Sequence, residues 1–390
     1  MTPAPPAPIA LLTYSTRPRG GVVHTLAVAE ALHGVGVPVH VYALGDPAVG
    51  FFRPVSVPHT IVAAPPWAPT LEERVFAAID ALTHGLRAEL AGAPRIVHAQ
   101  DCIAARAASS LRQDGWPVLV VRTVHHVDDF STPVLVDCQQ RSITEPDRVL
   151  VVSRHWQRLL AHEFGVRATV VHNGVDAARF ISPGHVAPAS LRVETGLDGS
   201  FVYLTVGGLE PRKGSLALVE ALAKARAAVG PRLRLAVVGG HSFQDHQPYR
   251  DRCLARAEEL GLNDDGLVLL GTVTDAALRA WYHAADAFVF PSVSEGWGLA
   301  VLEAMAAGLP VVASDIPVFR EYLTGEDAVL VPPHDADALA AAMAQLAEDA
   351  EQRARLATRG PRVAGKYTWR ACAEQHAEFY ETLGSPEQWA

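Results

Sequence analysis

The stretch from residue 286 to residue 315 constrains the fold of this chain more than any other. Residues 287–290 (Ala-Phe-Val-Phe) are a short apolar run closed by a proline, which predicts a fully buried strand. Two glycines then flank Trp297, and the Ala- and Leu-rich residues 299–307 predict a helix. Gly-Leu-Pro ends that helix, and residues 311–313 begin the next buried strand. A strand, a glycine turn, a helix and a second strand form the repeating unit of a parallel α/β sheet.

The same alternation of short apolar runs and helical patterns fills the rest of the chain. It predicts an α/β fold with parallel sheets, in which helices connect the strands. The expected strands are 8–13, 38–44, 60–64, 95–99, 117–124, 148–152 and 168–172 in the first half, and 202–207, 232–238, 266–271, 286–290, 310–313 and 328–331 in the second. The expected helices are 22–34, 71–90, 102–114, 133–144, 154–163, 214–228, 248–260, 274–284, 298–307, 335–348 and 351–365.

The length of the chain predicts two domains. With 390 residues, 49% of them hydrophobic, each half has enough apolar side chains for a core of its own. The segment 180–190 combines Pro and Gly with no strong period, so we expect it to be an interdomain linker. The first domain is therefore expected over 1–184 and the second over 185–367, followed by a segment with loosely helical spacing at 368–383.

The stretch 286–315 contains two carboxylates. Glu295 lies in its glycine turn, and Glu303 lies in its helix. The amino terminus of a helix presents free N–H groups and the positive end of its dipole, which suits an anion. A carboxylate repels phosphate, so Glu295 and Glu303 suit neutral hydroxyl groups instead. A nucleotide diphosphate sugar offers both a diphosphate and hydroxyls. The alternative is a surface Glu and an ordinary helix Glu, which is the commoner origin of such a pair in isolation.

A second candidate anion site follows the first strand of the second half, at residues 207–215 (Gly-Gly-Leu-Glu-Pro-Arg-Lys-Gly-Ser). Its lysine precedes the glycine, whereas a nucleoside-triphosphate P-loop requires Gly-Lys-Ser, so a P-loop is excluded. Arg212 and Lys213 beside a helix start suit a diphosphate, the arginine as a fork of donors and the lysine as a point charge. The alternative is a pair of solvated surface charges.

The run from Ser294 to Ser314 resembles the signature of retaining glycosyltransferases of the family-4 type. These have the GT-B fold, two Rossmann-like doubly wound parallel-sheet domains that face a central cleft. The resemblance implies that Glu295 approaches the donor sugar, that Glu303 binds the ribose, and that a final helix within 368–390 packs back onto the first domain. The donor-binding residues that it implies beside these carboxylates are Gly296, Trp297, Gly298 and Leu299.

Residues 207–215 resemble the donor motif of the same family. The sequence departs from that motif at Gly208, where many members carry Arg. Arg212 then supplies the missing charge, and Lys213 matches the motif directly. We therefore expect both cations to bind the donor diphosphate, with Gly208 among the donor-binding residues.

Two segments of the first half resemble the family as well. Gly20 and Gly21 follow the first strand, where the family carries a glycine pair near the donor diphosphate, and they permit close approach of a phosphate. Thr123-Val-His125 resembles a Thr-x-His segment whose histidine lies near the donor sugar, and an imidazole there can relay a proton. The candidate catalytic residues are Arg212, Lys213, Glu295 and His125.

Weaker signals mark the acceptor side. His98 and Asp101 end another strand, and Asn173 resembles a family position at the rim, although Asn-Gly is equally typical of a plain turn. The adjacent carboxylates Asp128 and Asp129, next to His126, could bind a metal ion in principle. They have no further obvious ligand, and the resemblance implies a metal-free site. We therefore expect no metal ion and no cofactor.

Composition excludes several other classes of protein. A net charge of −9 without a basic stripe argues against a nucleic-acid partner. No charge-free run of 18 residues predicts a membrane span, while peripheral membrane contact stays open. The amino terminus lacks the pattern of a signal peptide, and the four scattered cysteines lack the spacing of zinc or redox motifs. Together these features favour a cytoplasmic protein.

The sequence therefore predicts an enzyme that moves a hexose from a nucleotide diphosphate sugar to an acceptor, with retention of configuration. The base, the sugar and the acceptor, whether a sugar, a lipid or a small molecule, stay open. The alternatives are a GT-B nucleotide-sugar epimerase, a phosphorylase, and a non-catalytic protein that only binds nucleotide sugars.

Overall fold

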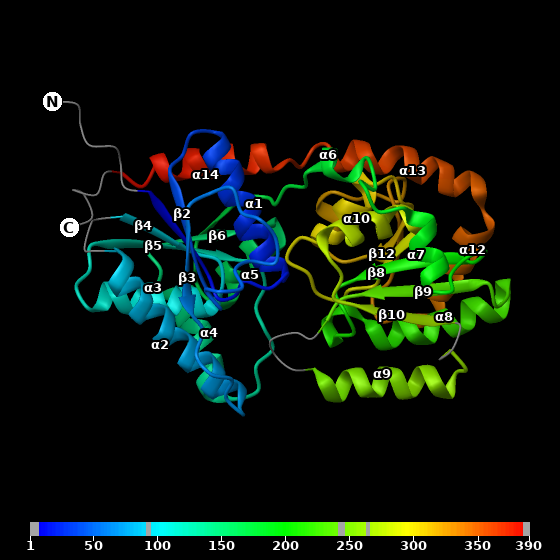
Figure 1. Cartoon of the computed structure of the whole chain (residues 1–390), viewed down its shortest axis with the longest axis horizontal. Helices are drawn as coiled ribbons and strands as arrows, with labels where there is room; N and C mark the ends of the chain where they lie inside the picture. The colour runs from blue at the N-terminus through cyan, green and yellow to red at the C-terminus, as the bar shows by residue number, and fades with distance from the viewer. Residues whose placement is uncertain (1–7, 91–94, 241–245, 263–265, 385–390) are drawn as a thin grey trace. The chain divides into compact units, whose positions relative to one another are not determined.

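The computed structural model describes residues 8–90, 95–240, 246–262 and 266–384, and its contacts divide the chain into two compact units (Figure 1). Unit 1 comprises Met1–Gly174 and Trp369–Ala390, and unit 2 comprises Val175–Thr368. The expected first domain extended to residue 184, whereas residues 175–184 group with the second unit.

Unit 1 is a seven-stranded parallel sheet with the strand order β3-β2-β1-β4-β5-β6-β7. Its strands are β1 (Ile9–Thr13), β2 (Val39–Gly45), β3 (His59–Ala63), β4 (Arg95–Ala99), β5 (Val118–Val124), β6 (Arg148–Val151) and β7 (Ala168–Val170). Its helices are α1 (Gly20–Gly34), α2 (Leu71–Leu90), α3 (Cys102–Gln113), α4 (Pro133–Thr144), α5 (Arg154–Glu163) and α14 (Trp369–Glu381).

Unit 2 is a six-stranded parallel sheet with the order β10-β9-β8-β11-β12-β13. Its strands are β8 (Phe201–Val206), β9 (Leu233–Val238), β10 (Leu267–Gly271), β11 (Ala287–Phe290), β12 (Val311–Ser314) and β13 (Val329–Val331). Its helices are α6 (Ala177–Phe180), α7 (Pro188–Glu194), α8 (Ser215–Val229), α9 (Gln247–Glu259), α10 (Asp275–Ala284), α11 (Leu299–Ala306), α12 (Ala336–Glu348) and α13 (Ala350–Ala364), with short 3-10 turns η1 (Pro211–Lys213) and η2 (Phe319–Glu321).

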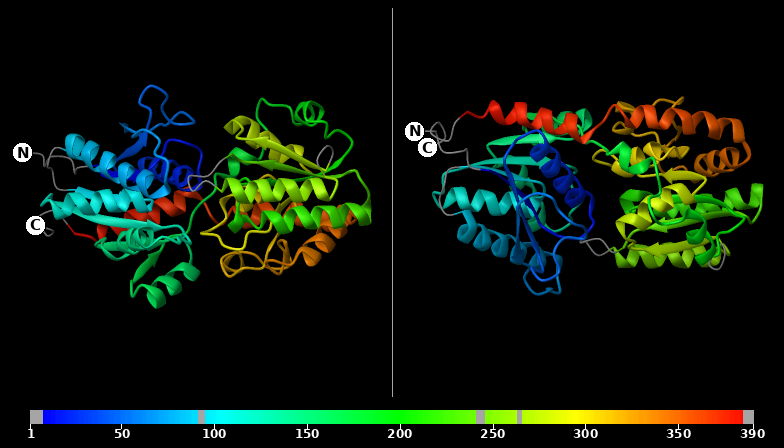
Figure 2. Two further views of the ribbon diagram at one scale, coloured as in Figure 1. Left: turned by 90° about the horizontal axis from the view of Figure 1, so that it is seen from below. Right: turned by 45° about the horizontal axis from the view of Figure 1, so that its top comes forward.

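Each sheet is covered by helices on both faces, as the doubly wound pattern requires (Figure 2). Because both faces of the sheet are buried, the central strands are apolar along most of their length, and β1, β5 and β11 have no exposed residue. In each sheet the strand order reverses at one point, between β1 and β4 in unit 1 and between β8 and β11 in unit 2. The predicted fold class is confirmed.

The last helix, α14, belongs to unit 1 although it follows unit 2 in the chain. It packs against α1, and Cys372, Ala373 and Tyr380 join the apolar core formed by α1 and the central strands. The hydroxyl of Tyr380 lies 2.6 Å from Nδ1 of the fully buried His98 on β4. The helix is therefore tied to the sheet by a buried polar contact as well as by apolar packing.

The expected linker over 180–190 is wrong in one respect, because helix α7 begins at Pro188 within it. Proline is accepted at the first turn of a helix, where its missing N–H would have no partner. Arg192 of α7 donates from Nε to the carbonyl oxygen of Ala284 at 2.6 Å, which fixes the helix on unit 2. The sequence pattern of such a short segment was too weak to predict a helix.

Candidate functional site

The candidate site of unit 2 lies where the strand order reverses, since ligands of open α/β sheets bind beyond the carboxyl ends of the strands there. The segment 207–214 follows β8, and the segment 291–298 follows β11. The backbone N–H of Val293 donates to the carbonyl oxygen of Arg212 at 2.8 Å, which joins the two segments. The two sequence motifs thus meet in one place.

Two glycines with positive φ lie in these segments, and one of them allows their close approach. Gly214 has φ +66°, and a Cβ there would lie 2.2 Å from the carbonyl oxygen of Pro291. Gly298, the residue before α11, has φ +89°, and a Cβ there would lie 2.5 Å from the ring of Phe319. A larger residue at Gly214 would push the two segments apart, and a larger residue at Gly298 would displace the Phe319 ring.

Glu295 lies between the two cations of η1. Its Oε1 accepts from Nζ of Lys213 at 2.5 Å and from Nη1 of Arg212 at 3.1 Å. The Lys213 ammonium also lies 4.3 Å from the centroid of the Phe290 ring, a cation–π contact. The side chains of Lys213 and Glu295 are 12% and 9% exposed, so this is a nearly buried ion pair, while Arg212 at 39% remains accessible. Solvated surface charges are therefore excluded as the interpretation of Lys213.

The charges of this cluster set the ionisation of its members. Burial raises the pKa of Glu295, but the charges of Lys213 and Arg212 outweigh it and hold that pKa below its ordinary value. Burial, with the charge of Arg212, lowers the pKa of Lys213 against the attraction of Glu295. A second carboxylate, Glu210, lies with Oε2 at 3.4 Å from Nε of Arg212. Two cations and two carboxylates thus form one compact charged site.

Glu303 occupies a different environment on α11. Its Oε2 accepts from the hydroxyl of Tyr282 on α10 at 2.8 Å. Burial raises the pKa of Glu303, opposed by the Tyr282 hydrogen bond and the charge of Arg179. The two carboxylates that share one sequence motif therefore have different partners and opposite pKa shifts. Nothing in the sequence pattern identified Tyr282, which lies 21 residues before Glu303.

The other predicted donor residues surround the cluster. Trp297 is 2% exposed and its ring contacts Tyr322 and Tyr367, so it is a core side chain that supports the turn rather than a free surface. Gly208 has φ +75°, and a Cβ there would lie 3.0 Å from the carbonyl oxygen of Gly240. Gly296 and Leu299 are partly exposed.

The candidate site of unit 1 lies at the corresponding point of its sheet, between β1 and β4. Asp101 caps α3: its Oδ1 accepts from the N–H of Ala104 at 2.8 Å, and its Oδ2 accepts from the N–H of Tyr14 at 2.9 Å. Gly20 and Gly21 are the first residues of α1, and no protein atom of the described residues lies within 4 Å of a Cβ built on either. Packing therefore does not require these two glycines.

Two histidines lie in contact beside this point. His125 follows β5, and its Nε2 lies 3.2 Å from Oε1 of Gln100. Its ring centroid lies 4.5 Å from that of His24 on α1, a residue at the end of the segment 17–24 to which the sequence analysis assigned no role. Burial lowers the pKa of His24 to about 3 and, together with the neighbouring His24, holds the pKa of His125 well below its ordinary value. His24 and His125 are therefore neutral at pH 7.

His98 and Asn173, two of the residues expected on the acceptor side, are buried. His98 is fully buried, with Nδ1 at 2.6 Å from the Tyr380 hydroxyl and Nε2 at 2.7 Å from Oγ1 of Thr123. Both ring nitrogens are thus occupied within the core. Asn173 is 4% exposed, and its side chain influences the pKa of His24. Of the three acceptor-side candidates, Asp101 is partly exposed and the other two are buried.

The candidate metal ligands of unit 1 do not form a metal centre. Nε2 of His126 lies 3.2 Å from Oδ1 of Asp128, and Asp129 is exposed. Within the described ranges, no group of three His, Cys, Asp or Glu side chains could hold a metal ion.

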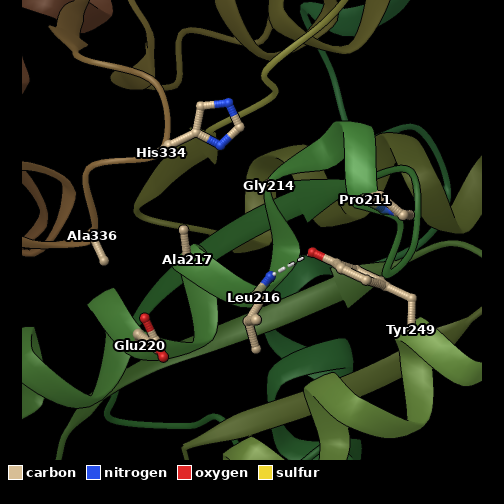
Figure 3. A pocket seen from close by; sticks show the side chains of 8 residues that line it. All are labelled: Pro211, Gly214, Leu216, Ala217, Glu220, Tyr249, His334 and Ala336. Carbon is tan, nitrogen blue, oxygen red and sulfur yellow. Dashed lines mark hydrogen bonds between the residues drawn. The ribbon is translucent and has the colours of Figure 1, made fainter. Parts of the chain in front are cut away.

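A pocket of about 310 Å³ lies beside the candidate site of unit 2 (Figure 3). Its lining includes Pro211, Gly214 and Tyr249, whose hydroxyl accepts from the N–H of Leu216 at 3.0 Å. Lys213 and Glu295 are not part of this lining, so the pocket lies next to the charged cluster and does not contain it.

Known proteins resemble this chain in both units. Residues 190–363 match the family model of glycosyl transferases group 1, and residues 18–179 match that of Glycosyltransferase Family 4. Over 389 residues the chain is 29% identical to the D-inositol 3-phosphate glycosyltransferase of Corynebacterium glutamicum (strain R), covering 93% of this chain and 91% of that protein.

The fold of this chain is similar to that of several solved structures. Sucrose-phosphate synthase of Thermosynechococcus elongatus superposes with a TM-score of 0.80 at 24% identity, over 96% of this chain and 98% of that one. HepE of Anabaena, solved in complex with UDP-glucose, superposes with a TM-score of 0.77 at 20% identity, over 96% of this chain and 99% of that one. The expected GT-B fold is confirmed.

In the parts of the chain that the structure describes, no helix is both long and apolar enough to cross a membrane.

Proposed function

The chain belongs to the glycosyl transferases of group 1, and from that premise we propose that it transfers a hexose from a nucleotide diphosphate sugar with retention of configuration. The observation that carries the donor class is the pairing of Lys213 and Arg212 with Glu295 where the unit 2 strand order reverses. Two cations offer a diphosphate its charge partners, and an adjacent ionised carboxylate offers a sugar hydroxyl its acceptor.

Donor binding in this proposal is an exchange of partners. In the structure, Glu295 accepts hydrogen bonds from both cations. A diphosphate, with more negative charge than one carboxylate, draws Lys213 and Arg212 toward its oxygens. Glu295 is then released to accept a hydrogen bond from the sugar. The same cations stabilise the negative charge that grows on the β-phosphate as the bond to the sugar breaks.

Glu303 is the candidate for the ribose in this proposal. It is partly buried and accepts one hydrogen bond from Tyr282, which orients the carboxyl group. The site as proposed needs no cofactor and no metal ion, because Lys213 and Arg212 supply the positive charge that a divalent cation supplies elsewhere.

The relatives suggest which substrates to try. HepE of Anabaena was solved with UDP-glucose, so UDP-glucose is the first donor to test. The relative from C. glutamicum is a D-inositol 3-phosphate glycosyltransferase, so D-inositol 3-phosphate is the first acceptor. Gly20 and Gly21, which packing does not require, leave the start of α1 open to the close approach of a phosphate.

A phosphorylase of the pyridoxal-phosphate type is less well supported, because it requires a lysine for the cofactor. The chain has three lysines. Lys213 is paired with Glu295, Lys224 with Asp337, and Lys366 lies on the surface. An epimerase would invert one centre of the donor sugar, and a protein that only binds its ligand would form no product.

One experiment separates these functions. The protein is incubated with UDP-, GDP- and ADP-sugars, with and without D-inositol 3-phosphate, and the products are followed by ion-exchange chromatography and NMR. The proposal predicts release of nucleoside diphosphate with a glycoside whose anomeric configuration equals that of the donor. An epimerised donor, an inverted product, or binding without turnover for every donor that shifts the melting temperature would overturn it.

A further inference from the structure

Two cysteines that are far apart in the sequence lie side by side in unit 1. Cys102 is the first residue of α3, and Cys138 lies on α4. Their sulfur atoms are 3.9 Å apart, and Sγ of Cys102 also lies 3.8 Å from the carbonyl oxygen of Cys138. The other two cysteines, Cys253 and Cys372, are buried in the cores of the two units. The scattered spacing of the four cysteines gives no sign of this contact.

We propose that Cys102 and Cys138 are a redox-active pair, which hydrogen peroxide converts into an intramolecular disulfide between α3 and α4. Bond formation brings the sulfur atoms from 3.9 Å to a bond length of about 2.05 Å. Cys138 is buried and Cys102 is partly exposed, so a small oxidant reaches the pair from the side of Cys102.

The surroundings make the two sulfur atoms unequal. The hydrogen bond from Cys102, together with the charges of Arg106 and Arg141, lowers the pKa of Cys138 against the effect of burial. The same contact and burial raise the pKa of Cys102 well above its ordinary value. In the proposed reaction Cys138 is the thiolate that attacks the oxidant, and Cys102 is the thiol that resolves the product.

The reaction balances with one molecule of peroxide. The Cys138 thiolate attacks one oxygen, the O–O bond breaks, and Cys138 becomes a sulfenic acid while hydroxide leaves and takes up a proton as water. Cys102 then attacks the Cys138 sulfur, the S–O bond breaks, and the departing hydroxide combines with the Cys102 proton as a second water. Two thiols lose two electrons in total and form one disulfide.

The position of the pair connects it to the candidate site of unit 1. Cys102 directly follows Asp101, the cap of α3. Cys138 precedes Gln139, whose Nε2 donates to the carbonyl oxygen of Asp128 at 2.8 Å and whose Oε1 accepts from the Asp128 N–H at 2.7 Å. A disulfide therefore ties the start of α3 to the helix that holds the segment after His125. Oxidation would therefore link α3 to α4 beside the candidate site of unit 1, whichever substrate the protein uses.

The test uses the reduced full-length protein and does not depend on activity. The protein is treated with a few equivalents of hydrogen peroxide at pH 7.5, alkylated with iodoacetamide, digested without reductant and analysed by mass spectrometry. We expect linked peptides containing Cys102 and Cys138, lighter by two hydrogens, that separate again on reduction. Cys253 and Cys372 should remain free thiols.

Variants distinguish the roles of the two cysteines. In Cys102→Ser, Cys138 should accumulate as a sulfenic acid that dimedone traps, whereas in Cys138→Ser, Cys102 should trap several-fold less dimedone. Cys253→Ser is the matched control and should form the disulfide as the unaltered protein does. Failure of the unaltered protein to form the link, or a link to Cys253 or Cys372 instead, would overturn the proposal.

Discussion

The two units share one type of sheet, yet the side chains that lie in contact beside the reversal of strand order differ in charge. In unit 2, Lys213 and Arg212 carry positive charge and Glu295 carries negative charge, so the groups are satisfied by pairing. In unit 1, His24 and His125 lie in contact with each other, and burial keeps both of them neutral. One arrangement keeps opposite charges together, and the other keeps two imidazoles uncharged.

The two arrangements suit different ligand groups. A buried ion pair is costly to desolvate, and a partner that replaces one of its members can bind without leaving a bare charge. Neutral imidazoles offer hydrogen bonds but no charge, so they suit hydroxyl groups and do not attract a phosphate. We therefore expect donor affinity to depend on the charges of unit 2, and the acid stability of the protein to depend on the histidines of unit 1.

The largest effect is expected on the stability of unit 1 at low pH. The pKa of His24 is about 3 and that of His376 about 4 in the folded protein, whereas an unfolded histidine titrates near 6.5. The unfolded chain therefore binds more protons below pH 6.5, and stability is lost as the pH falls from there toward 3. At pH 4 the loss should be on the order of 5 kcal/mol, seen as a fall in the urea midpoint of unit 1.

A replacement that cannot titrate provides the control for this prediction. His376→Gln should be less stable at pH 7 but should show a shallower dependence on pH than the unaltered protein. His33, in the last turn of α1 and exposed, is the matched position, and His33→Gln should leave the pH dependence unchanged. Equal slopes for all three proteins would show that the buried histidines do not govern acid stability.

The next largest effect is expected on turnover in Glu295→Ala. The variant loses the carboxylate that is proposed to hold the sugar in the transition state, which should reduce kcat by roughly 100-fold or more. Affinity for free nucleoside diphosphate should stay the same or increase, because Lys213 and Arg212 lose the competing carboxylate. The measurements are steady-state kinetics and calorimetry on the same preparation; a large loss of diphosphate affinity would contradict the exchange of partners.

A smaller effect is expected for Glu303→Ala. Loss of the hydrogen bond to the ribose should weaken nucleoside diphosphate binding by about 1–2 kcal/mol, roughly a factor of ten. Tyr282→Phe is the matched control, since it removes the hydroxyl that donates to Glu303 but keeps the carboxylate. It should cost less affinity than Glu303→Ala. An equal loss for Glu295→Ala and Glu303→Ala would mean that the two carboxylates do not divide the ligand between them.

The smallest effect is expected from removal of divalent cations. With the charge supplied by Lys213 and Arg212, turnover at saturating donor should persist in EDTA, and Asp128→Ala should leave donor affinity nearly unchanged. The measurement is the initial rate with and without chelator. A collapse that Mg²⁺ or Mn²⁺ reverses would return His126, Asp128 and Asp129 to consideration as ligands.

Much of the fold could be predicted because parallel strands buried on both faces are continuous apolar runs. The residues between Asp286 and Gly308, for example, predicted strand β11 and helix α11. Helix α7 was not, because its seven residues have no buried side chain and hence no apolar period. Its position depends on the contact of Arg192 with Ala284, which no local pattern encodes.

Residues of the candidate site could be predicted from the sequence only where they lie within one continuous motif. The motifs identified Lys213 and Glu295 separately, and the reversal of strand order between β8 and β11 brings them together. His24 and His376 were missed because each is a single histidine on a helix, with its partners far away in the sequence. The contact of Cys102 with Cys138 was missed for the same reason, as 36 positions separate them.

The affinity of Lys213→Ala for nucleoside diphosphate tests most directly whether unit 2 binds the donor. Lys213 provides the closest cation to Glu295 and is proposed to move to the diphosphate when donor binds. Calorimetric titration of UDP, and of GDP or ADP if the donor screen favours them, should show a loss of about 1.5–3 kcal/mol relative to the unaltered protein. Lys224→Ala, on the outer surface, should show none. An unchanged affinity in Lys213→Ala would contradict the central claim that unit 2 binds the donor through its charged cluster.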